Sequence, residues 1–504
     1  MNDQAESSRT RREPDIVTHS LYPSPSFHAI KIVFWWSIAL WAMCAVSGRW
    51  QPHLVSDSAS YLDYPFASLE SMARYSRLPA YPALLRACLA IAPSESVGLQ
   101  LVVLVQILLQ AIAVSFFMIE MRRWGLSRSA AIAAAAAVAV GCSFWDHVST
   151  IATDCAAMSW GVITAACILR GWRIGFSTPL AAGVAASSLL SISLRPAYLF
   201  LLPWVITMVL FRAGDGVLPP WTRRWRDVAV IGSLPLVVLL GWCQFRYTVA
   251  NDFSLLPFGH QNMAAVTTQL LDNDELEQMS GPGGALASEI ARRRVAVSTG
   301  RSGRASQPGT GAIDGLDLRV TSDPSLRADS YMTLENRWDA MTYLVAIPAA
   351  IAVAGDDPID QHRLLAELDR QIVLAYPLRY ARWWMLAMRR GIWGSVANIV
   401  MHPIFLMVIV LAAGVAMLVC IWPQVISSRA EMDSEPARCS ARARRALVLL
   451  AISYAATGLA FVALTSPTIG RFSDAAFVFL PSLAALAMVS KCGRLRLSLG
   501  QSSR

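Results

Sequence analysis

Residues 97–119 read VGLQLVVLVQILLQAIAVSFFMI, which is 23 residues without a charged side chain. A run of this length and polarity can cross the hydrocarbon core of a bilayer as one helix. Similar runs recur along the 504-residue chain, which is 55% hydrophobic and only 15% charged. A soluble domain usually carries about a quarter charged residues. The sequence therefore predicts an all-α polytopic membrane protein.

The apolar runs predict about ten transmembrane helices. In chain order they are expected at 32–47, 97–119, 129–145, 155–169, 179–194, 197–211, 228–245, 404–421, 446–464 and 475–489. The apolar patch 343–354 is shorter than a crossing helix, so it predicts an interfacial or re-entrant segment, with a true crossing as the alternative. Because the first apolar run begins only near Ile32, after a polar start, no cleaved signal peptide is expected.

The distribution of charge predicts the orientation. The net charge of +9 comes almost wholly from arginine, mostly in short loops between spans. Ten spans place four such loops on the same side as both termini: Arg122–Arg123, Arg170–Arg173, Arg223–Arg226 and Arg442–Arg445. Because positive loops face the cytoplasm, we expect a multi-pass protein in the plasma (inner) membrane of a bacterium, with both termini cytoplasmic. This pattern favours contact with membrane lipids and argues against a nucleic-acid partner.

On this topology the chain divides into five parts. They are a cytoplasmic tail (1–31), a transmembrane module (32–245) with a first outer loop (48–96), an extracytoplasmic loop region (246–397), C-terminal spans (398–490) and a cytoplasmic tail (491–504). Residues 280–330 are rich in glycine, serine and arginine and are expected to be flexible. Residues 356–390 show helical periodicity instead. Five apolar residues share one face there: Leu364, Leu365, Leu368, Ile372 and Val373.

The first outer loop carries the first candidate for chemistry, in the stretch SDSASYLDYPFASLESMARYSRLPAYPALL at 56–85. Asp57 stands at an expected helix start, with Ser56 as its N-cap. An acid there is favoured by the helix dipole, so capping alone would explain it. The alternative is a general base. Tyr61 follows one turn later, and short amphipathic helices in this loop are expected to lie on the bilayer surface.

Arg77 is the second candidate, in the run Tyr-Ser-Arg-Leu-Pro-Ala-Tyr-Pro that starts at Tyr75 and includes Tyr81. A guanidinium at the membrane face can bind a phosphate through paired hydrogen bonds. Contact with lipid headgroups is the alternative reading.

Two further arginines are candidates. Arg195 lies between two expected spans, and an arginine near membrane depth is costly without a partner, so a functional role is the default. Arg471 lies near the last span. With Asp474 it can instead form a salt bridge at a helix start.

Metal ligands are weakly indicated. Asp146, His147 and Asp154 flank a short outward turn, but their spacing matches no known metal motif and helix capping is the favoured reading. The nine cysteines also lack metal-site spacing. The sequence thus assigns no cofactor, and a divalent metal stays an open alternative without support from these motifs.

Together these motifs resemble those of the GT-C superfamily of membrane glycosyltransferases, and most closely its protein O-mannosyltransferase and aminoarabinose transferase branch. The matching positions are Asp57, Tyr61, the R-x-P-x-Y-P run Arg77–Pro82, Thr153–Asp154, Leu194–Pro196 and Arg471–Phe472. The resemblance covers residues 30–212 best and the last two spans weakly. Ser58 stands where many members have a second acid, which weakens the case for a loop-bound divalent metal. Region 246–397 matches nothing in the family.

The resemblance implies transfer of a sugar, as by a hexosyltransferase, from a polyprenyl-phosphate donor to a lipid, glycan or protein acceptor, with inversion. Asp57 would be the base, and Arg77, with Arg195 or Arg471, would stabilise the departing phosphate. The substrate-binding tyrosines would be Tyr61, Tyr75 and Tyr81, with Asp154 as a secondary site candidate.

Two other functions stay open. A transporter or flippase of a lipid-linked or polar solute would show mid-span charges and internal repeats. The sequence shows no repeat, and Gln106 and Gln110 are the polar intrusions in the second span. An inactive relative that acts as an assembly partner would be expected to lack the acid at Asp57.

Overall fold

The structure is a computed structural model. It describes residues 25–144, 147–211, 221–298, 331–401, 435–468 and 473–489. The fold is 81% helical, with no strand in these residues, and this confirms the all-helical prediction. The nearest feature to a strand is a single parallel bridge between His53 and Thr150.

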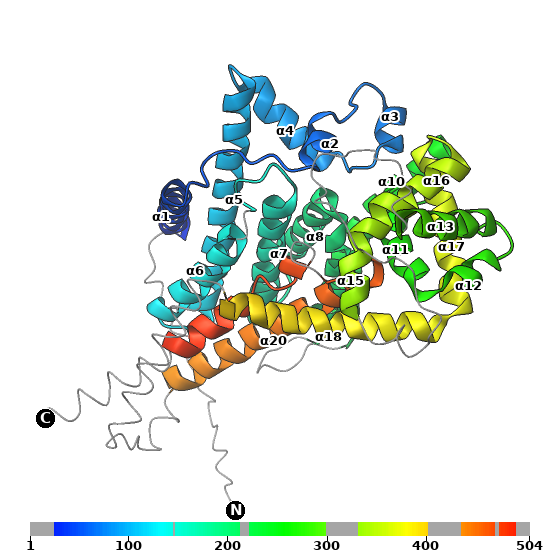
Figure 1. Cartoon of the computed structure of the whole chain (residues 1–504). Coiled ribbons are helices and arrows are strands. Elements are labelled where there is room, and N and C mark those ends of the chain that lie inside the picture. Colours follow the sequence, from blue (N-terminus) through cyan, green and yellow to red (C-terminus); the bar gives the residue numbers. More distant parts are fainter. Residues whose placement is uncertain are drawn as a thin grey trace, which may run out of the picture.

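The first half of the chain builds one bundle of apolar helices (Figure 1). Its members are α1 (Pro25–Val46), α5 (Glu95–Arg123), α6 (Arg128–Phe144), α7 (Asp154–Ile174), α8 (Thr178–Leu194), η1 (Pro196–Phe200), α9 (Leu201–Leu210) and α10 (Trp221–Ala250). Helix α5 packs against α1, α6 and α7, and α7 packs against α8. Alanine and glycine on α6 and α7 allow this close approach, because small side chains let helix backbones come together.

Five of the described helices are long and apolar enough to cross a membrane. They are His28–Val46, Glu95–Arg123, Asp154–Ile174, Trp221–Ala250 and Ser440–Thr465. Shorter apolar helices occupy the expected third, fifth, sixth and tenth spans. The expected eighth span, 404–421, lies outside the described residues. Several helices can therefore span a membrane, and the number of ten stays a prediction.

The first outer loop forms three short helices: α2 (Ser58–Leu62), α3 (Leu69–Arg74) and α4 (Ala80–Ile91). The expectation that Ser56 caps a helix starting at Asp57 is wrong. Helix α2 starts one residue later, and Asp57 stands at its N-cap position without a capping hydrogen bond from its side chain. The reason is that the Asp57 carboxylate is engaged elsewhere, as described below.

The region after α10 has a core of its own. Its helices are α11 (Gly259–Thr267), η2 (Thr268–Leu270), α12 (Asn273–Glu277), α13 (Gly284–Ser298), α15 (Tyr331–Ala340), the π-helical turn η3 (Met341–Ala346), α16 (Ile347–Ala354), α17 (Pro358–Ala375) and α18 (Pro377–Met401). Figure 1 shows α18 leading back to α20 (Glu435–Thr465), against which it packs.

One expectation about this region needs correction, and a second stays open. Residues 280–330 were expected to be flexible, but Gly284–Ser298 forms helix α13, whose Leu286 and Ile290 are fully buried. Apolar residues at helical spacing outweigh the glycine- and serine-rich composition there. The patch 343–354 is part of a helix that runs from Tyr331 and turns by 113° into α17, so the re-entrant segment and the crossing both stay predictions. Such a bend is the geometry of a re-entrant loop or a broken span.

Candidate functional site

Asp57 and Arg77, twenty residues apart in sequence, form an ion pair. Arg77 Nη2 donates to Asp57 Oδ1 over 2.9 Å, and Arg77 Nε donates to Ser60 Oγ over 2.8 Å. The two charged side chains are 17% and 32% exposed, so the pair lies at a partly open surface. Two acceptors at the start of α2 therefore fix the plane of the guanidinium.

Aromatic rings surround the same guanidinium. Its central carbon lies 4.8 Å from the centroid of the Tyr61 ring and 5.4 Å from that of Phe258. The Tyr61 ring in turn meets the Tyr81 ring edge-on, with 5.3 Å between centroids. A cation over an aromatic face is held electrostatically. The site thus presents a planar cation, held in place and partly open to solvent.

The loop that carries Asp57 is tied to the segment before α7. Ser58 Oγ donates to the Ile151 carbonyl over 2.8 Å and accepts from the Val55 N–H over 2.9 Å. The His53 N–H donates to the Ser149 carbonyl over 2.8 Å. Ser58 is therefore buried and structural, and it fixes the position of its neighbour Asp57.

Gln106 on α5 supports this junction from inside the bundle. Its Nε2 donates to the Val148 carbonyl over 2.9 Å, and its Oε1 accepts from the Tyr81 hydroxyl over 3.4 Å. Tyr81, a predicted substrate-binding residue, is 1% exposed. In this structure Tyr81 supports Tyr61 and does not face solvent.

Tyr75 packs against Tyr64, with 5.2 Å between ring centroids. Burial raises the pKa of Tyr64 to about 12, and the positive charge of Arg246 opposes that rise. Burial, and then the negative charge of Asp63, also raises the pKa of Tyr75. Both phenols therefore stay protonated at neutral pH and can act as hydrogen-bond donors.

Asp154 and Arg195 form a second ion pair. Asp154 begins α7 and Arg195 follows α8, and both side chains are buried. The costly arginine predicted from the sequence thus has an acidic partner, which agrees with the expectation for a charge near membrane depth. The structure brings these two predicted residues to each other.

The remaining candidates do not assemble into a metal site. Arg471 and Asp146 lie outside the described residues. Asp474, the expected partner of Arg471, lies 3.3 Å from His147 Nε2. Across the part of the chain that the structure describes, no group of three or more His, Cys, Asp or Glu side chains is placed to hold a metal ion.

Sequence reasoning missed a polar cluster at the end of α10. Arg246 is fully buried, and its Nη2 donates to Asp252 Oδ2 over 2.6 Å. Asp252 also accepts from Ser254 Oγ over 2.7 Å and lies 3.5 Å from His362 Nδ1. Arg246 could have been noticed as a charge at the end of an apolar run, but its partners come from the following loop and from α17.

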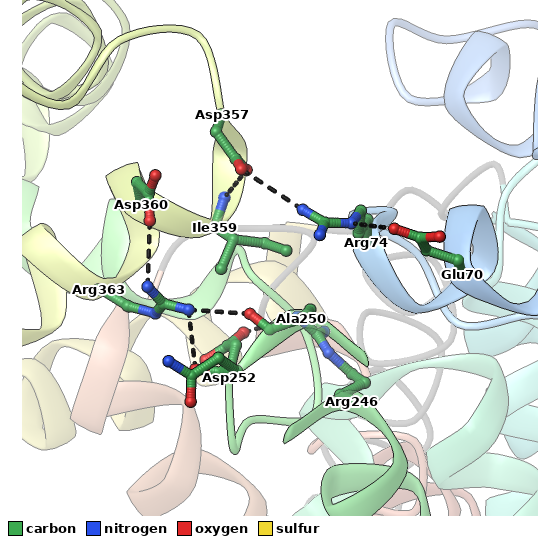
Figure 2. A network of polar contacts seen from close by, with 10 residues as sticks. Glu70, Arg74, Arg246, Ala250, Asp252, Asp357, Ile359, Asp360 and Arg363 are labelled. Atoms are coloured by element: carbon green, nitrogen blue, oxygen red, sulfur yellow. Dashed lines mark hydrogen bonds and ion pairs between the residues drawn. The ribbon is translucent and has the colours of Figure 1, made fainter. Parts of the chain in front are cut away.

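Figure 2 shows how the first outer loop meets α17. Arg74 on α3 bonds to Glu70 over 3.2 Å and reaches Asp357, the N-cap of α17, over 3.5 Å. Arg363 on α17 donates to the carbonyls of Ala250 and Asn251, each over 2.9 Å. Helix α17 is therefore linked both to the first outer loop and to the end of α10.

Comparisons of the chain with protein-family models, with curated proteins and with solved structures gave no match. The reading of the site therefore depends on its residues alone.

Proposed function

We propose that this chain is an integral membrane glycosyltransferase of the GT-C type. It moves a sugar from a polyprenyl-phosphate donor to a hydroxyl or amine on the extracytoplasmic face, with inversion. In this proposal about ten spans cross the bacterial inner membrane and both termini are cytoplasmic. The observation that supports it is the Asp57–Arg77 ion pair, set among aromatic rings in a loop between apolar helices.

The pair suits the chemistry of this reaction. Transfer needs positive charge next to the departing phosphate, and Arg77 supplies a planar, partly exposed cation. Transfer also needs a group that accepts the proton of the incoming hydroxyl. Asp57 can act there as the base, as expected from the sequence, or as the partner that orients Arg77.

A transporter or flippase is the second candidate, and the Asp154–Arg195 pair favours it. Ion pairs buried among apolar helices are typical of transport pathways. The two functions differ in outcome. A flippase moves the intact lipid-linked sugar across the bilayer, whereas a transferase separates the sugar from its lipid phosphate.

The test uses the purified protein in lipid nanodiscs with a panel of radiolabelled polyprenyl-phosphate hexoses and an extract of envelope glycans, lipids and proteins as acceptors. Release of polyprenyl phosphate with label on an acceptor supports the proposal and names the sugar and the acceptor class. Asp57→Asn should abolish release, whereas Asp360→Asn, an exposed acid on α17, should leave it unchanged.

Two results of this assay would count against the proposal. Full activity of Asp57→Asn would refute the assignment of this site. Movement of intact donor between the leaflets of proteoliposomes, without label on any acceptor, would favour the flippase.

A further inference from the structure

Helices α11 and α17 carry a histidine–carboxylate pair. His260 is the second residue of α11, and its Nδ1 lies 2.8 Å from Asp369 Oδ2 on α17. Asp369 is fully buried and also accepts from Thr267 Oγ1 over 2.5 Å. The His260 side chain keeps 35% of its surface exposed.

This arrangement selects one form of the imidazole. A carboxylate that accepts from Nδ1–H leaves the lone pair on Nε2, and it stabilises the imidazolium that forms when Nε2 takes a proton. Burial raises the pKa of Asp369, and the hydrogen bonds from His260 and Thr267 act against that rise. A buried acid, a fixed ring and an accessible edge are the features of an orientated base.

The pair is connected to the Arg77 guanidinium through Phe258. Phe258, two residues before His260, is the ring that packs 5.4 Å from the Arg77 guanidinium. On the other side, the His260 ring lies 5.1 Å from the His362 ring. The ionisable groups around His260 are thus Asp369 and His362 on α17, with Asp252 behind His362.

Asp57 is less suited to take the proton. Its Oδ1 accepts from Arg77 over 2.9 Å, so protonating this carboxylate would weaken the contact that holds the guanidinium. The departing phosphate needs that guanidinium at the same moment. A separate proton acceptor removes this conflict.

We propose that His260 is the base of the transfer reaction, with Asp369 and Thr267 as positioning residues and Asp57 as the partner that holds Arg77. The inference rests on the transferase function proposed above. The acceptor oxygen forms the new bond to the anomeric carbon, and the bond from that carbon to the phosphate oxygen breaks. The electron pair leaves with the polyprenyl phosphate, which Arg77 stabilises, and the acceptor proton moves to His260 Nε2.

The experiment compares variants in the nanodisc assay, with polyprenyl phosphate itself as the probe for donor-site binding. His260→Gln should lower turnover about 100-fold, the low end for loss of a general base, with unchanged affinity for polyprenyl phosphate. His28→Gln, at an exposed position of α1, is the matched control and should keep wild-type turnover. Added imidazole should restore turnover to His260→Ala, and Asp369→Asn should lose turnover without rescue.

Each outcome decides between the two proposals. If the wild-type protein transfers sugar and His260→Gln is equally active, His260 is not the base. The same conclusion follows if imidazole does not restore turnover to His260→Ala. Both outcomes overturn the role of His260 and leave the transferase proposal unaffected. Loss of polyprenyl phosphate binding in His260→Gln would show a structural role and would also overturn it. If the wild-type protein releases no polyprenyl phosphate from any donor, the transferase proposal fails and the role of His260 fails with it.

Discussion

Replacing Asp252 by asparagine should destabilise the protein strongly, although the side chain hardly changes in size. Asp252 is the acid bonded to the fully buried Arg246 (Figure 2). Among the described residues, Arg246 Nε and Nη1 have no hydrogen-bond partner. The bond to Asp252 is therefore the main contact that compensates the buried positive charge.

The magnitude follows from this geometry. Removing one partner of a buried ion pair costs about 3–5 kcal/mol, because the other charge stays in the interior. Asparagine keeps an oxygen that can accept from Arg246, although a neutral acceptor bonds about half as strongly. We expect a loss of about 3 kcal/mol from Asp252→Asn, which corresponds to a fall of about 6–12 °C in midpoint for a unit of 150–250 residues.

A thermal melt with a thiol-reactive dye measures this change, because the described cysteines are free and mostly buried. The matched control is Asp360→Asn, which breaks an exposed pair with Arg363 at 3.1 Å and should cost about 0.5 kcal/mol or less. The double variant Arg246→Gln/Asp252→Asn should recover stability relative to Asp252→Asn. The reasoning is wrong if Asp252→Asn and Asp360→Asn have the same melting midpoint. It is also wrong if the midpoint of the double variant is below that of Asp252→Asn.

Three further predictions follow from other contacts. Gly171→Ala should lower the melting midpoint, at a cost of about 1–3 kcal/mol, because a Cβ there would overlap the Phe176 ring. Gly183→Ala should leave the midpoint unchanged, because the nearest contact of its Cβ would be 3.9 Å away. Equal midpoints for the two variants would contradict this. Burial raises the pKa of Asp252, but hydrogen bonds and nearby positive charge outweigh that rise and hold the pKa below 3.8. The difference in unfolding free energy between wild type and Asp252→Asn should therefore disappear as pH falls below about 4. A difference that persists in acid would refute this. Arg77→Lys should have the melting midpoint of the wild type but bind polyprenyl phosphate about tenfold more weakly, because an ammonium lacks the planar donors of a guanidinium. Unchanged affinity would indicate that Arg77 contacts lipid headgroups instead.

Local pattern predicted much of the bundle. The uninterrupted apolar run at 97–119 lies within α5, and Leu365, Leu368 and Ile372 are buried on one face of α17, as their helical spacing indicated. Apolar length and periodicity determine such elements locally, because each helix must bury its apolar face. The sequence also placed Asp57 and Arg77 in one short loop, where they form an ion pair.

Contacts between distant segments were not predictable from one sequence. Phe258 and His260 follow Arg77 by about 180 residues, and no local pattern connects them with the first outer loop. Asp154 and Arg195 were each noticed, but their pairing depends on how α7 packs against α8. Composition was misleading at α13, because glycine and serine obscured the spacing of its buried residues.

The packing of Phe258 on Arg77 has a consequence for biosynthesis. A nascent chain that has emerged only as far as α10 already carries the Asp57–Arg77 pair, but it lacks the ring that covers the guanidinium and the histidine that follows. The site is then assembled late in translation, after the bundle is inserted. On the proposed function, a chain that ends after α10 would therefore be inert even if it reached the membrane, and supplying residues 251–504 as a separate polypeptide should restore the site by complementation.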